Sequence, residues 1–173
     1  MRQGASTLWE LSLRDSSDEF LLDPGSLDLL QHFSALEHLD LNLQIKPHAM
    51  DNALISSTAW HHLHVLRLPS TGSIDRASTI TLNSLCTLSQ CSTLESLTLQ
   101  VDARWNKNVP PHAYDTHNNS LVQLAVLPNS PIDNWLSISE FINCSFPSVV
   151  QFRGPYGRDP YSMQWAFVAN RLR

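Results

Sequence analysis

The chain is poor in glycine, cysteine and charged residues. Of its 173 residues, 5 are glycines and 3 are cysteines, and charged side chains make up 16%. So few glycines leave no Gly-rich loop of the kind that cradles phosphates, and neither a Gly-x-Ser-x-Gly nucleophile elbow nor a zincin motif occurs. No run of 18 apolar residues is present, so we expect no membrane span.

The charge balance and the first residues narrow the class of protein further. A net charge of −5 argues against nucleic acid as a partner, because phosphate binding needs clustered Lys and Arg. The opening Met-Arg-Gln-Gly-Ala-Ser-Thr lacks the apolar stretch of a secretory signal. Three cysteines in a chain of this size do not indicate a disulfide framework. We therefore expect an intracellular protein, cytoplasmic or nuclear.

Two of the cysteines, Cys86 and Cys91, lie five residues apart and allow two interpretations. They form either a metal or redox pair, or part of one helix that leads into the next strand, with Cys91 buried. The second interpretation is favoured, because a structural zinc site needs four convergent ligands.

The histidines raise the same question. His61, His62 and His64 cluster in one segment, and His112 and His117 lie in another. A His-x-x-His pair on one helix can bind zinc, but the cluster crosses an expected helix–strand junction without a carboxylate at ligand spacing. Surface histidines are the favoured interpretation. We expect no catalytic residue, metal or cofactor, and a protein that is not an enzyme.

A repeated apolar signature is the main positive feature of the sequence. Six copies of Leu-x-x-Leu-x-Leu, the last two degenerate, start 28, 27, 31, 27 and 28 residues apart, and such a period is typical of solenoid proteins. The Leu-x-x-Leu-x-Leu core is that of a leucine-rich-repeat strand, with its leucines on one face. The six expected strands lie near 8–14, 36–42, 63–69, 94–100, 121–127 and 149–154.

The segments between the signatures predict the rest of the fold. Parallel strands need long crossover connections, and helical stripes of apolar residues occur in four of the five connections. The sequence predicts an α/β leucine-rich-repeat solenoid: one domain over 1–173, with six parallel strands on the concave side and helices and one irregular loop on the convex side. The expected helices are 26–33, 51–60, 78–91 and 132–141, the irregular loop is 102–120, and a capping helix at 159–173 covers the open end.

The ninth position of each signature is a second regular feature. In leucine-rich repeats an asparagine there uses its side-chain amide to bond the neighbouring turn, and only Asn129 is that residue. Four of the other ninth residues are polar and can substitute for asparagine in part. Because the position diverges from asparagine, we expect an irregular arc.

The third, fifth and seventh residues of each signature are expected to face away from the leucines. They form a mixed polar surface, acidic in the second repeat and basic in the third and sixth. Such a surface binds proteins or peptides more often than small molecules, which need a deep apolar pocket; the alternative is a merely solvated surface. The expected binding residues are Glu10, Arg14, His38, Asp40, Asn42, Arg67, Thr98, Gln100, Gln123, Gln151 and Arg153, and the remaining outward positions are Ser12, Val65, Pro69, Ser96, Ala125, Leu127 and Pro155.

Three segments carry a resemblance to a known family. They are Cys91-Ser-Thr-Leu-Glu-Ser-Leu-Thr-Leu99, Leu124-Ala-Val-Leu-Pro-Asn-Ser-Pro-Ile132, and Phe146-Pro-Ser-Val149 together with Trp165-x-x-Val168. With its repeats, the chain resembles the C-terminal leucine-rich-repeat region of fungal (basidiomycete-like) F-box proteins. The resemblance implies the substrate-recognition arc of a cullin–RING ubiquitin ligase receptor, whose F-box docks on a Skp adaptor.

The chain departs from that family in one respect, because we find no F-box in it. Leu127-Pro128 has the opening of one but lies in phase within the fifth repeat. A Skp adaptor is therefore expected as a partner only if an F-box exists outside this chain. The leading hypothesis is a protein-interaction module that holds a protein substrate or peptide on its concave face. The alternatives are a truncated or degenerate repeat fragment with a structural role and, third, an enzyme built on the histidine cluster.

Overall fold

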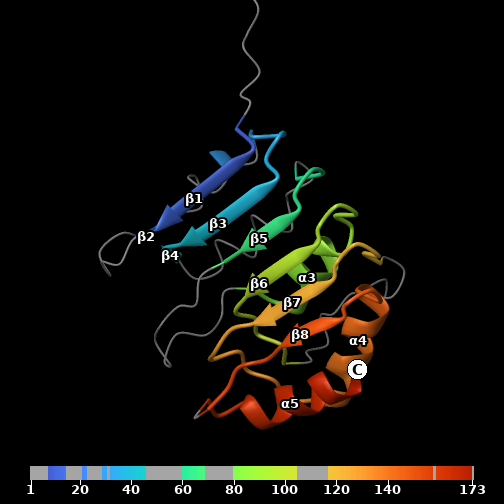
Figure 1. Cartoon of the computed structure of the whole chain (residues 1–173). Coiled ribbons are helices and arrows are strands. Elements are labelled where there is room, and N and C mark those ends of the chain that lie inside the picture. Colours follow the sequence, from blue (N-terminus) through green and yellow to red (C-terminus); the bar gives the residue numbers. More distant parts are fainter. Residues whose placement is uncertain are drawn as a thin grey trace, which may run out of the picture.

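The computed structural model describes residues 8–14, 21–22, 29–30, 32–45, 60–68, 80–104, 117–157 and 159–172. Within these ranges the chain has an α/β fold, as predicted, with a six-stranded parallel sheet and the helices α3, α4 and α5 (Figure 1). A short parallel pair, β2 (Leu21–Leu22) with β4 (Gln44–Ile45), lies beside the large sheet and was not predicted.

The six strands of the large sheet follow one another in chain order, so each is paired with the strand of the next signature. Every pairing is parallel, and the order is β1-β3-β5-β6-β7-β8. The strands are β1 (Glu10–Arg14), β3 (His38–Asn42), β5 (Val65–Arg67), β6 (Ser96–Leu99), β7 (Gln123–Val126) and β8 (Gln151–Arg153).

The register aligns equivalent positions of the six signatures. Leu66, for example, is the partner of Leu97, which in turn faces Leu124. Each strand begins two residues after its predicted start, because the first two signature residues lie in the preceding turn. There, the second residue's carbonyl accepts two bonds from the next repeat. The Glu95 oxygen, for instance, accepts the Val122 and Gln123 N–H groups at 2.9 and 3.1 Å.

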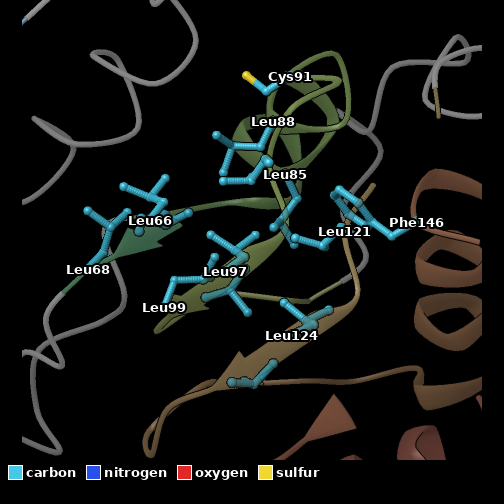
Figure 2. Close-up of a cluster of buried hydrophobic side chains, with 14 of the residues drawn as sticks. Leu66, Leu68, Leu85, Leu88, Cys91, Leu97, Leu99, Leu121, Leu124 and Phe146 are labelled. Carbon is cyan, nitrogen blue, oxygen red and sulfur yellow. The ribbon is translucent and has the colours of Figure 1, made fainter. Parts of the chain in front are cut away.

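The core lies on the leucine face of the sheet. Leu66, Leu97 and Leu99 are fully buried and belong to one cluster with Leu85 and Leu88 of α3 (Figure 2). Burial of such side chains stabilises the fold by about 1.5–3 kcal/mol each relative to exposure. The leucines of β1 are only half buried, as expected for the outermost strand.

Two of the four predicted connecting helices lie largely within the described residues. Helix α3 (Leu82–Leu88) lies inside the predicted range 78–91. Helix α4 (Trp135–Ser145) starts and ends later than the predicted 132–141. Ile132 instead forms a bridge with Ala103, and Asn134 caps the helix by accepting the Ser137 N–H. Of the other predictions, residues 51–59, residues 26–28 and 31 of the helix 26–33, and residues 105–116 of the irregular loop lie outside the described residues; Leu29 and Leu30 are helical.

Helix α5 (Ser162–Arg171) lies within the predicted terminal segment, 159–173, and beside β8 (Figure 1). Its Trp165 is 1% exposed, stacks on Phe152 of β8 and donates its indole N–H to the Ser130 oxygen at 2.8 Å. Helix α5 also contacts α4 through the Trp135–Phe167 ring pair, whose centroids are 5.4 Å apart. These contacts join the last strand to both helices.

None of the helices within the described ranges has the length and apolar character needed to cross a bilayer.

Candidate binding face and its groove

The face of the sheet opposite the leucines is polar. We call it the polar face and define it by the third and fifth residues of the six signatures. As predicted, each of these side chains is exposed or half exposed, because residues of a strand alternate between its two faces. The members are Glu10, Ser12, His38, Asp40, Val65, Arg67, Ser96, Thr98, Gln123, Ala125, Gln151 and Arg153.

The seventh residues follow the prediction in part, and Leu127 is half exposed. Arg14 and Asn42 still belong to β1 and β3, and both are exposed. Gln100 is 1% exposed, so its expected place on the binding surface is wrong, and Pro155 is buried as well. The reason is that β6 ends at Leu99 and β8 at Arg153, so the alternation stops before the seventh residue. Pro69 lies outside the described residues.

An open groove of about 410 Å³ crosses the polar face over the strands β5 to β8. Ser96, Thr98 and Ala125 are the small side chains of its floor, and they sit on the two central strands. Ser96 and Ala125 lie on this face as predicted, although they were not among the expected binding residues. The full lining is Arg67, Ser96, Leu97, Thr98, Gln123, Leu124, Ala125, Gln151 and Arg153.

The two arginines of the groove occupy equivalent positions on β5 and β8. The register runs from Arg67 to Thr98, then to Ala125 and Arg153, so the two arginines are three strands apart. At about 4.8 Å per strand, their backbones are separated by about 14 Å. Both side chains are exposed, and within the described part of the chain neither has a carboxylate within ion-pair distance. The described lining also contains no acidic residue.

The other end of the polar face, over β1 and β3, is different in charge. A smaller cavity of about 260 Å³ lies there and extends to β5. Its charged or titratable lining residues are Glu10, Arg14, His38, Asp40 and Arg67. Arg14 donates to the Asp40 carboxylate at 2.8 Å, so these opposite charges compensate each other. Trp9 is 56% exposed and meets the His38 ring edge-on, with centroids 6.1 Å apart. Arg67 of the basic third repeat lines this cavity as well as the groove, because β5 lies directly beside the acidic β3.

Partly buried polar contacts join the turns that follow β6 and β7. Gln100 donates its side-chain amide to the Asn129 oxygen at 2.8 Å, and the Asn129 N–H donates to the carboxylate of Asp159. Asn129 has a positive φ of 60°, a conformation that asparagine tolerates better than most residues. The sequence predicted that the side-chain amide of Asn129 bonds the neighbouring turn. The bonds described here run through its backbone instead.

Sequence reasoning missed Asn118, the buried asparagine that joins three repeats. Its side-chain amide donates to the Cys91 and Leu94 oxygens, and its Oδ1 accepts the Ser120 and Leu121 N–H groups at 2.7 and 2.9 Å. Its own N–H donates to the Ser145 oxygen at 2.8 Å. A signal was present: the residue three before the other described signatures is Phe33, Trp60, Cys91 or Phe146, and only here is it polar.

The remaining candidates of the sequence analysis do not converge on a reactive centre. Cys86 lies in α3 and Cys91 follows it, and both are buried, whereas Cys144 is exposed. Burial raises the pKa of the Cys91 thiol. His64 Nδ1 is 3.2 Å from the Glu95 carboxylate, while His61, His62 and His117 are exposed and His112 lies outside the described residues. No group of three His, Cys, Asp or Glu side chains within the described ranges is placed to hold a metal.

No family model matches the chain, and searches of the curated proteins and of the solved structures also find no match. Function is therefore inferred from the residues and geometry of the polar face.

Proposed function

We propose that the protein is a protein-interaction module that is not an enzyme, and that it binds a protein or an extended peptide on the polar face. The groove over β5 to β8 carries this proposal. It is open and lined mainly by hydroxyl, amide and guanidinium groups. A small-molecule site is typically a deep, mostly apolar pocket, whereas a shallow polar surface with arginine suits a protein partner.

The proposed architecture is a leucine-rich-repeat solenoid with the polar face on its concave side. The register supports it, since equivalent signature residues are neighbours across all six strands. The packing of α3 and α4 on the leucine face supports it too. Helices are about 10 Å wide and strands are about 4.8 Å apart, so helices stacked behind a sheet bend it toward the opposite face.

Within this class, the chain is proposed to be the substrate-recognition arc of an F-box-type ubiquitin ligase receptor. The support is the resemblance of the segments around Cys91, Leu124 and Trp165 to fungal F-box proteins, and structurally the polar face supplies a surface for a substrate. Contact with a Skp adaptor would require an F-box outside residues 1–173. An intracellular location, cytoplasmic or nuclear, is part of this proposal.

The test is affinity capture with variants that fill the groove. Ala125→Trp places a large side chain on the groove floor, and Ala166→Trp makes the same change at an exposed position of α5. Both variants are first checked for an unchanged thermal unfolding midpoint. We expect a set of proteins whose recovery, measured by quantitative mass spectrometry, falls at least about fivefold with Ala125→Trp and stays constant with Ala166→Trp.

Equal recovery with the native chain and both variants would contradict the proposal. The polar face would then be ordinary solvated surface, and the chain would be better described as a repeat fragment with a structural role.

A further inference from the structure

The two arginines of the groove define a charge pattern that a partner can match. Arg67 and Arg153 are exposed at opposite ends of the groove, while Thr98 and Ala125 occupy the same register position between them. Arginine presents a planar fork that bonds a carboxylate through two N–H groups. Two arginines on backbones about 14 Å apart suit two carboxylates at a similar separation.

The polar groups between the arginines favour an extended chain over a helix. A helix satisfies its own backbone N–H and C=O groups, whereas an extended segment presents them to its surroundings. The groove offers Thr98 and Ser96 hydroxyls and the Gln123 and Gln151 amides, which donate and accept hydrogen bonds. An extended chain advances about 3.3 Å per residue, so residues i and i+4 are about 13 Å apart and point to the same side.

We propose that the groove recognises an extended acidic peptide segment in which carboxylate side chains at positions i and i+4 bind Arg67 and Arg153, with a small residue at i+2 over Thr98 and Ala125. This inference rests on the proposed function and specifies its ligand. Net charge favours a peptide over nucleic acid, because a chain with a charge of −5 repels a polyanion beyond its two local arginines.

The Asp40 carboxylate could compete with the ligand's carboxylate for Arg67. Asp40 is the register partner of Arg67 on the neighbouring strand, but Arg14 engages its carboxylate at 2.8 Å. Among the ion pairs of the described residues, Asp40 pairs with Arg14 and not with Arg67. The groove is left with two cationic groups that a partner can bind.

The experiment uses fluorescein-labelled synthetic peptides of Gly, Ser and Thr with two aspartates separated by two, four or six positions. Fluorescence anisotropy with the full chain at low ionic strength gives the affinity of each peptide. We expect the i, i+4 peptide to bind tightest, and salt to weaken it. Arg67→Gln and Arg153→Gln are each expected to lower its affinity about fivefold. The matched control, Arg171→Gln on α5, leaves the affinity unchanged.

Three outcomes would overturn the inference. The peptides could bind with equal affinity at all spacings, or their affinity could be unchanged by both Arg67→Gln and Arg153→Gln. A single-stranded oligonucleotide could also bind more tightly than the i, i+4 peptide in an arginine-dependent way. Its failure can be told apart from failure of the proposed function. If captured partners depend on Ala125 but not on Arg67 or Arg153, the acidic-peptide inference is wrong and the interaction module remains. If capture is indifferent to Ala125→Trp as well, both are wrong.

Discussion

Asp40 lies beside Arg67 in the register of β3 and β5, yet its carboxylate bonds to Arg14 of the outermost strand, at 2.8 Å. An arginine outside the groove is thus the ion-pair partner of the carboxylate next to Arg67. The pair is partly exposed, with side-chain exposures of 66% for Arg14 and 24% for Asp40, so its contribution to stability is small. Its importance in this account is to hold Asp40 away from Arg67.

The first prediction follows from this relationship. Arg14→Ala frees Asp40 to pair with Arg67, so the affinity for the i, i+4 acidic peptide should fall about threefold although Arg14 does not line the groove. Adding Asp40→Asn removes the competitor and should restore the affinity to at least the native value. Anisotropy titrations of the single and double variants measure both changes, and a double variant as weak as Arg14→Ala would show that Asp40 does not act on Arg67.

A second prediction concerns the core. Leu97→Asp or Leu124→Asp places a carboxylate among leucines that are 0% and 2% exposed, and a buried unpaired charge costs several kcal/mol. We expect these variants to be unfolded at ordinary temperature. Thermal melting monitored by circular dichroism measures the change. The control is Gln123→Asp, which introduces the same side chain next to Leu124 but on the exposed face of β7. An unchanged melting curve for Leu97→Asp would contradict the repeat architecture.

The third prediction tests the role of Asn118. Asn118→Ala leaves buried backbone groups of its neighbours without their partners, which should lower the free energy of unfolding by about 2–4 kcal/mol in urea titrations. The neighbouring exposed Asn119→Ala should change it by less than about 0.5 kcal/mol. Similar losses for the two variants would mean that the contacts of Asn118 contribute little.

Asn118→Asp tests the same contacts through the pH dependence of stability. The carboxylate still accepts the Ser120 and Leu121 N–H groups but faces the Cys91 and Leu94 carbonyl oxygens. Burial and those oxygens raise its pKa in the folded state above the unfolded value. The variant should therefore be closest to native stability at acidic pH and should lose stability as pH rises through the folded-state pKa.

The fourth prediction concerns the thiols. Cys144 is exposed and should react with a disulfide reagent in a fast phase, while the buried Cys86 and Cys91 react only as the fold opens. Cys144→Ser should remove the fast phase alone. Burial raises the pKa of Cys91, so its contribution to stability is present below the unfolded value and is lost as pH rises through the folded-state pKa. Two fast thiols in the native protein would contradict this arrangement.

The sequence predicted the strand positions well because the core imposes a strict requirement at every repeat. Leu39, Leu66 and Leu97 are fully buried at equivalent positions, and this requirement makes leucine recur at a regular spacing in the sequence. The third and fifth residues then face the other side by simple alternation. The period does not say where each strand ends, so the burial of Gln100 after β6 could not be foreseen.

Contacts between different repeats were less predictable. Ser130 illustrates the reason: its backbone oxygen accepts the indole N–H of Trp165, a residue 35 positions later. Such contacts depend on how successive turns are placed against one another, and this placement leaves no local pattern in the sequence. The choice of Asp40 between two neighbouring arginines is of the same kind, because alternation puts all three on one face without deciding which pair forms.

The central claim, that the polar face binds a partner, is tested most directly by site-specific photocrosslinking. A photoreactive amino acid is placed at Gln123, exposed in the groove on β7, and in a second protein at Leu136, which is 41% exposed on α4. Irradiation in cell extract should give a discrete protein adduct from position 123 that competing acidic i, i+4 peptide suppresses, and none from position 136. Adducts from position 136 but not from position 123 would contradict the account.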